Sequence, residues 1–271
     1  MGRLAAFLGV FTMMTLWEFF RPRRSLPQPR RERWLTNLGL ILLNIVLVRV
    51  TLGGVVYGAA VVAAERDIGL LHWISFSHLA AAAVTLLVLD FAVYLQHVMV
   101  HALPILWRLH RVHHADLGFD ATTGLRFHPF EIFLSLGFKV AVVILVGAVP
   151  WAAVAFETML NAASVFNHGN VAIPEKADRW LRRLIVTPDM HRIHHSTRIM
   201  ETNSNFGFSV SWWDRLCGTY RAEPVLGQVG MEVGLSEYKD PSRLSVARLL
   251  LLPFQGSAGR YAFEGTQPAR P

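Results

Sequence analysis

The chain has 271 residues, of which 53% are hydrophobic and only 17% charged, where about 25% charged is ordinary for a soluble protein. This composition excludes a disordered or collagen-like chain, and a single cysteine excludes an internal disulfide framework. The net charge of +7 does not indicate nucleic-acid binding, because no recognition motif accompanies it. Six arginines instead lie close together in one short stretch: Arg21, Arg23, Arg24, Arg30, Arg31 and Arg33.

Apolar runs suited to a membrane follow one another along the first part of the chain. They cover residues 4–20, 38–64, 79–96 and 132–166. A spanning helix needs about 20 residues, so the second run must tilt or project beyond the membrane. The fourth run contains Gly147 and Pro150, and we expect two helices joined near Pro150 because proline interrupts a helix. The sequence predicts an all-α protein, an integral membrane helical base of about four to five spans including this hairpin.

The arginine-rich loop sets the predicted orientation. Loops with an excess of Lys and Arg usually lie on the cytoplasmic side of a membrane, and this loop joins the first two apolar runs. With residues 132–166 as a hairpin, residues 97–128 and the chain after residue 167 are cytoplasmic as well. We therefore predict a multi-pass integral membrane protein whose histidine-rich helical cap is cytosolic.

Histidine is the most informative residue type, because ten of the twelve lie between His97 and His195. Three of the motifs have helical spacing. An i, i+4 pair places two imidazoles on one helix face, and the other two motifs add a third imidazole at i+3. The motifs are His97 with His101, His110 with His113 and His114, and His191 with His194 and His195.

A ninth metal-ligand candidate is His168, which ends a polar stripe on an otherwise apolar helix. The stripe runs through Glu157, Asn161 and Ser164, and Asp90, Tyr94, His97 and His101 repeat it at the same offsets. Intramembrane charges usually have partners, so we expect Asp90 to pair with Arg49 and Glu157 with Lys139.

Three further residues are predicted to be either ligands or supports for ligands. His128 is equally compatible with metal binding and with a place at the start of a helix. Tyr94 lies one turn from His97 and could orient it, and Asn170 follows His168 closely. His72 and His78 fall on the opposite side of the membrane and are expected at its interface.

Nine imidazoles are too many for one metal ion and suit two ions with four or five ligands each. Neutral imidazole binds Zn, Cu, Fe and Ni. Carboxylate-rich di-iron sites use Glu and Glu-x-x-His ligands, which do not occur here. The spacing thus predicts an all-histidine site for two metal ions at the membrane surface.

From about Val88 to Arg221 the sequence resembles the fatty acid hydroxylase superfamily of sterol desaturase-like membrane di-iron oxygenases. The similarity rests on the three histidine motifs and on Arg126–Pro129, Asn167–Asn170, Asn205–Gly207 and Trp213–Tyr220. It implies two irons held by the nine histidines, with zinc as a contaminant of purified protein and O2 as co-substrate. It also implies hydroxylation or desaturation of a membrane lipid or sterol-like substrate.

The resemblance suggests three regions. Residues 1–78 would hold N-terminal spans and the basic loop, residues 79–222 the di-iron catalytic region, and residues 223–271 a cytosolic extension. The sequence has no cysteine cluster for iron–sulfur binding and no GxGxxG fingerprint. Electrons are therefore expected from a separate donor, ferredoxin-like or a similar reductase system.

Two alternatives remain open from the sequence. A zinc-dependent membrane hydrolase would need a carboxylate base, typically in HExxH, and neither HxxHH motif supplies one. A non-catalytic metal-binding membrane scaffold would keep the histidines without turnover.

Overall fold

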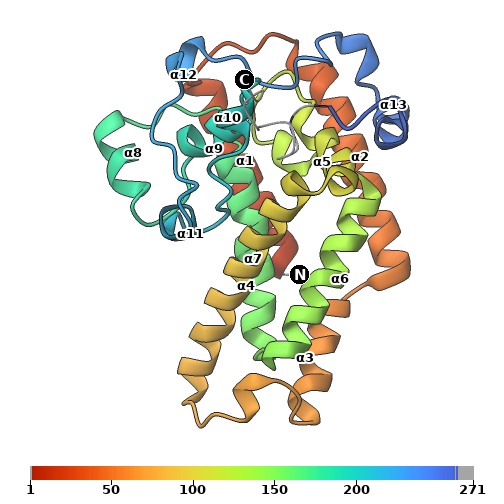
Figure 1. Cartoon of the computed structure of the whole chain (residues 1–271), viewed down its shortest axis with the longest axis vertical. Coiled ribbons are helices and arrows are strands. Elements are labelled where there is room, and N and C mark those ends of the chain that lie inside the picture. Colours follow the sequence, from red (N-terminus) through yellow and green to blue (C-terminus); the bar gives the residue numbers. More distant parts are fainter. Residues whose placement is uncertain (1, 260, 262–271) are drawn as a thin grey trace, which may run out of the picture.

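The computed structural model describes residues 2–259 and 261, and the regular structure in this part of the chain is helical (Figure 1). A long helical base carries a cap of short helices and loops at one end, as the sequence predicts. The base contains α1 (Gly2–Phe20), α2 (Arg30–Leu52), α3 (Val55–Glu65), α4 (His78–Ala102), α6 (Pro129–Val146) and α7 (Pro150–Asn167), with the 3-10 turn η1 (Leu70–His72).

The cap is formed by the short helices that follow α4 and α7. These are α5 (Pro104–His114), α8 (Glu175–Leu181), α9 (Pro188–His194), α10 (Ile199–Thr202), α11 (Trp212–Leu216), α12 (Gly227–Gly230) and α13 (Val246–Leu251). The 3-10 turns η2 (Thr123–Leu125), η3 (Pro241–Arg243) and η4 (Leu252–Phe254) complete it.

The described residues include four candidate membrane spans, Gly2–Phe20, Arg30–His72, His78–Ala102 and Pro129–Val146. Their outward side chains are apolar and exposed, for example Leu42 at 63%, Leu79 at 73% and Leu145 at 65%. Large exposed apolar side chains on every span fit lipid contact. The protein is therefore a multi-pass membrane protein.

The second apolar run breaks rather than continuing as one tilted helix. α2 ends at Leu52 and α3 begins at Val55. Gly54 lies between them with a φ of 77°, a left-handed conformation that glycine adopts without steric cost. The break divides a run that is too long for one span into two helices. After the break, α3 packs against α6 and α7.

The predicted hairpin is present as α6 and α7. Gly147 ends α6 with a φ of 70°, and Pro150 is the first residue of α7, where proline fits because its missing N–H has no partner to lose. The two arms meet at the far end of the base and diverge toward the cap (Figure 1). Each arm packs against α3 and α4.

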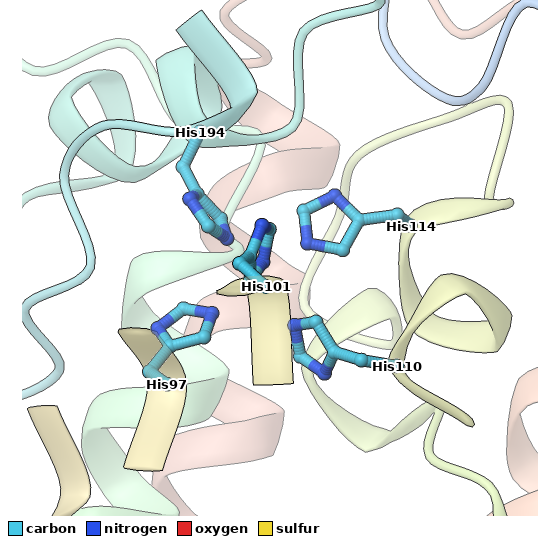
Figure 2. Close-up of side chains that lie close together, drawn as sticks. All are labelled: His97, His101, His110, His114 and His194. Atoms are coloured by element: carbon cyan, nitrogen blue, oxygen red, sulfur yellow. The ribbon is translucent and has the colours of Figure 1, made fainter. Parts of the chain in front are cut away.

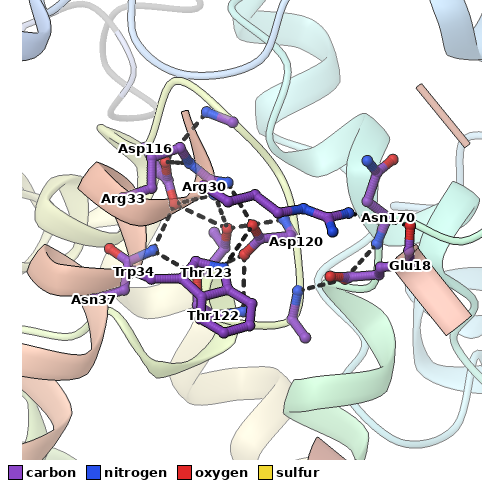
Figure 3. Close-up of polar contacts among 12 residues, drawn as sticks. Glu18, Arg30, Arg33, Trp34, Asn37, Asp116, Asp120, Thr122, Thr123 and Asn170 are labelled. Atoms are coloured by element: carbon purple, nitrogen blue, oxygen red, sulfur yellow. Dashed lines mark hydrogen bonds and ion pairs between the residues drawn. The ribbon is translucent and has the colours of Figure 1, made fainter. Parts of the chain in front are cut away.

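A buried polar network joins the base to the cap (Figure 3). The Arg33 guanidinium donates to Asp116 at 2.8 Å and to Asp120 at 2.5 Å, and all three side chains are at most 2% exposed. Glu18, at the end of α1, accepts from the backbone N–H groups of Ala121 and Asn170 at 2.7 and 2.9 Å. The loop after the second histidine motif is thus fixed by the first two spans.

Candidate metal centre

Nine buried histidines form two adjacent groups where the base meets the cap. Within each group the potential ligand nitrogens all lie within 4.8 Å of one another. The first group contains His97, His101, His110, His114 and His194, whose rings point toward a common centre (Figure 2). The second group contains His113, His168, His191 and His195.

Three helices and one helix end deliver these side chains. His97 and His101 come from the last turns of α4. α5 and α9 each serve both groups. α5 supplies His110 and His114 to the first group and His113 to the second. α9 supplies His194 to the first group, and α9 with its C-cap supplies His191 and His195 to the second. His168 is the C-cap of α7. The i, i+3, i+4 spacing therefore separates the imidazoles instead of bringing all three to one ion.

The hydrogen bonds around the first group prepare its rings for metal binding. The Nδ1 atoms of His97 and His194 lie 2.8 and 2.9 Å from the carbonyl oxygens of Phe206 and Ser204. A carbonyl only accepts, so Nδ1 carries the proton and Nε2 keeps its lone pair. Nε2 of both rings, and of His101 and His110, is buried without a partner in the described part of the chain. Unpaired buried nitrogens that converge are the donor set an ion would satisfy.

The second group has short contacts between ring nitrogens. Nε2 of His168 lies 3.1 Å from Nε2 of both His113 and His191. Nδ1 of His168 donates to the Ser164 carbonyl at 2.7 Å and Nδ1 of His113 to the Arg126 carbonyl at 3.3 Å. The facing Nε2 atoms of His113 and His168 therefore both carry lone pairs, and a shared cation explains their approach better than a hydrogen bond does.

Burial keeps the cap histidines neutral. Desolvation, followed by neighbouring histidines, lowers the pKa of five of them well below the ordinary value of 6.5: His113, His114, His191, His194 and His195. Desolvation lowers the pKa of His168 to about 4. Only a neutral imidazole can bind a metal, so these side chains are in the competent form at neutral pH.

Glu131 is a site residue that the sequence interpretation missed. Its Oε1 lies 2.6 Å from Nδ1 of His110, which is the arrangement of a carboxylate that orients a metal-binding imidazole. In the sequence, Glu131 sits in the first turn of α6, where an acid is ordinarily explained by the helix dipole. The signal available in the sequence was its position two residues after the Arg126–Pro129 motif.

The three residues predicted as ligands or supports lie outside both groups. His128 is the N-cap of α6, where its Nδ1 accepts from the Phe130 N–H at 3.2 Å, so the helix-start alternative describes its place. The Tyr94 hydroxyl lies 3.0 Å from the Thr219 hydroxyl. The Asn170 side chain exchanges hydrogen bonds with the Arg24 backbone, which fastens the arginine loop to the cap.

The two predicted intramembrane ion pairs have different outcomes. Lys139 donates to Glu157 at 3.3 Å, which confirms that pair. The prediction that Asp90 pairs with Arg49 is wrong, because Asp90 accepts instead from the Trp213 indole at 2.8 Å. α11 lies against this part of α4 and supplies a neutral donor.

A cavity of about 330 Å³ runs between α4, α6 and α7 up to both groups. His97, His110 and His113 form part of its wall, and most of the remaining lining is apolar. Polar side chains interrupt that lining at Gln96, Ser135, Lys139 and Asn161. The cavity can thus bring an apolar chain to the imidazoles of either group.

Comparison with known proteins gives relatives that share about half of the chain. It is 27% identical to the ornithine lipid hydroxylase OlsE of Rhizobium tropici over 51% of this chain and 41% of that protein. It is 27% identical to human alkylglycerol monooxygenase, over 49% of this chain and 29% of the relative. For human cholesterol 25-hydroxylase the identity is 29%, over 52% of this chain and 51% of the relative.

The chain therefore spans roughly a third to a half of the length of these relatives, and no solved structure matches it significantly. The fatty acid hydroxylase family profile matches residues 82–219, about half of the sequence. This segment contains every histidine of both groups. The chain belongs to the fatty acid hydroxylase family.

Proposed function

We propose that the protein is a membrane-bound non-haem di-iron oxygenase that hydroxylates, or alternatively desaturates, a lipid or sterol-like substrate with O2 and external electrons. The observation that carries the proposal is the pair of all-histidine groups of five and four, opening onto an apolar cavity within the membrane base. The relatives that are named as hydroxylases and a monooxygenase support hydroxylation over desaturation.

The chain's own residues would perform three tasks. The nine histidines would hold two iron ions, and those ions would supply the O2 chemistry that no side chain can perform on an unactivated C–H bond. The apolar wall of the cavity would bind the chain of the lipid and exclude water. Glu131 and the carbonyls of Phe206 and Ser204 would keep the proton on Nδ1 of their imidazoles, leaving Nε2 for the metal.

We further propose that the histidine end of the molecule is cytoplasmic. Arg21 and Arg31 are exposed at this end, in keeping with the excess of positive charge in cytoplasmic loops. Because the sequence contains no cofactor fingerprint for electron transfer, a separate ferredoxin-like or similar reductase system would supply electrons. The exposed Arg21 and Arg31 at this end suit an acidic donor of that kind.

Incubation with 18O2 tests the function. The iron-loaded protein, a competent donor system and a membrane lipid extract should yield a lipid product that carries one labelled oxygen atom. An unlabelled product that has lost two hydrogens would identify desaturation. Oxygen-independent hydrolysis by the zinc-loaded protein would contradict the proposal in favour of the hydrolase alternative, and bound metal without any turnover would favour a scaffold.

A further inference from the structure

Three charged side chains meet in the middle of the membrane base, beside the cavity and away from the histidines. Lys139 donates to Oε1 of Glu157 at 3.3 Å, and the Arg3 guanidinium contacts Oε2 of the same carboxylate at 2.9 Å. The Lys139 and Glu157 side chains are only 12% and 11% exposed. Two cations thus share one carboxylate, which leaves this group with one uncompensated positive charge.

Of these three side chains, Lys139 lines the cavity. Its ammonium has three N–H donors, of which one is used by Glu157 within the described residues. A self-contained structural ion pair would need only one cation for Glu157. Because Glu157 is shared with Arg3, it compensates the charge of Lys139 only in part. An intramembrane ionisable residue usually marks a functional site.

Neutral polar groups surround the same part of the cavity. Ser135, one turn before Lys139 on α6, donates to Gln96 on α4 at 3.3 Å. Asn161, one turn after Glu157 on α7, also lines the cavity, and this exposed residue makes no side-chain hydrogen bond to the described part of the chain. Polar groups from α4, α6 and α7 therefore lie on the wall of a cavity whose lining is mostly apolar.

We propose that Lys139, with Asn161 on the same cavity and Arg3 on the second oxygen of Glu157, forms a subsite that binds an anionic oxygen group, such as a carboxylate, on the lipid substrate. Lys139 is eight residues from Glu131 on α6, or about 12 Å along the helix axis. Because Glu131 touches the His110 imidazole, the reacting carbon lies about that far from the anionic group. The subsite would select a substrate with an acid group over a plain hydrocarbon and would fix where along the chain oxidation occurs.

This inference rests on the proposed function, because it takes the cavity as the path of the lipid to the metal. Its test is a binding measurement that needs no turnover. Stearate and methyl stearate have the same chain and differ in charge, so each can be titrated into the purified, metal-containing protein in neutral detergent. Tryptophan fluorescence or the shift in unfolding temperature reports binding.

Stearate should bind the wild-type protein about tenfold or more tighter than methyl stearate, as a hydrogen bond between charged groups implies. Lys139→Met should abolish this preference while leaving methyl stearate binding within about twofold. Lys139→Arg should retain it. Arg3→Gln changes a partly exposed side chain and should reduce the preference severalfold, whereas Arg66→Gln, on an exposed arginine outside the cavity, should not.

Equal binding of the acid and the ester by the wild-type protein would overturn the subsite, and so would a preference that survives Lys139→Met. If the preference depends on Lys139 but 18O2 is never incorporated, the subsite stands and the oxygenase proposal fails. If oxidation occurs without any preference for the acid, the oxygenase stands and the subsite fails.

Discussion

At the scale of single residues, the site depends on where each imidazole keeps its proton. In both groups, Nδ1 of several imidazoles is hydrogen-bonded to an oxygen outside the group. The oxygen is a backbone carbonyl for His97, His113, His168 and His194, and the Glu131 carboxylate for His110. Such outer contacts fix the ring and raise its affinity for a metal. Among them, the His110 contact comes from a side chain that can be replaced without moving the backbone.

Glu131→Leu should therefore weaken metal binding by the first group, by roughly 10- to 100-fold, because His110 loses the acceptor that orients it. Metal analysis after dialysis against graded concentrations of a chelator measures the loss. Glu175→Gln, on an exposed side chain of α8, serves as the control. Unchanged chelator resistance in Glu131→Leu would mean that His110 is oriented by other contacts.

Two histidines on neighbouring segments allow a direct comparison. His168→Ala removes one of four members of the second group and should lower the metal content from about two ions per chain to about one. His128→Ala removes a helix cap and the contact of the imidazole with the Leu250 carbonyl, at a cost of roughly 1–3 kcal/mol, and should keep both ions. Elemental analysis of the two purified variants, side by side, distinguishes them.

The sequence predicts the nine histidines because helical spacing and polar stripes are local properties. It does not predict how they divide between the groups. His113 and His114 are adjacent, yet they serve different groups, and this depends on how α5 lies against α4 and α9. The partners of Asp90 and His110 likewise come from α11 and α6, distant in the sequence, so spacing alone could not identify them.

At the scale of elements, the arginine loop is a structural clamp as well as a signal for orientation. Arg33 binds Asp116 and Asp120, Arg23 binds Asp189, and Arg24 donates to the Met231 carbonyl. In the sequence these arginines look like equivalent surface charges, because the sequence does not show which acidic side chains of the cap lie next to them in the fold. The end of α6 and the start of α7, in contrast, can be predicted from Gly147 and Pro150 in the sequence.

Arg33→Leu should destabilise the cap by roughly 3–5 kcal/mol, because Asp116 and Asp120 would remain buried without their cation. Arg31→Leu, two residues away on an exposed side chain, should change stability by no more than about 0.5 kcal/mol. Chemical unfolding in detergent, followed by tryptophan fluorescence, gives both values. Similar values for the two variants would show that the buried pair contributes little.

At the scale of the whole molecule, the chain reverses direction so that all metal-group residues reach one end. α4 and α7 run toward the cap and α6 runs away from it (Figure 1). The arginine loop lies at the same end, whereas the turn before α4 lies at the other. This arrangement agrees with the one-sided placement expected from the hairpin.

Labelling with a membrane-impermeant maleimide checks the orientation. In a Cys217→Ser background, Ser25→Cys in the arginine loop should react only from the cytoplasmic side, and Ser75→Cys before α4 only from the opposite side. Both positions are exposed. The reverse pattern would place the histidine groups outside the cytoplasm. Reaction of both cysteines from the same side would show that the chain between residues 25 and 75 does not cross the membrane an odd number of times.

Acid should open the cap of the metal-free protein before the base. The buried cap histidines have pKa values below the ordinary value, whereas unfolded histidines take up protons near pH 6.5. The unfolded state thus binds more protons as the pH falls below about 6.5, and stability decreases with it. Hydrogen exchange, corrected for intrinsic rates, should show cap protection falling between pH 7 and 5 while α3 and α6 stay protected.

Because α5 and α9 each serve both groups, we expect an ion bound in one group to affect the binding of an ion in the other. An ion in the first group orders His110, His114 and His194, and with them the backbone that carries the ligands of the second group. The second ion then binds ligands that the first ion has already ordered, so its binding costs less conformational entropy. This effect favours positive cooperativity. Chelator titrations should release both ions together in a steep transition, and protein with a single ion should be scarce at every stage of loading.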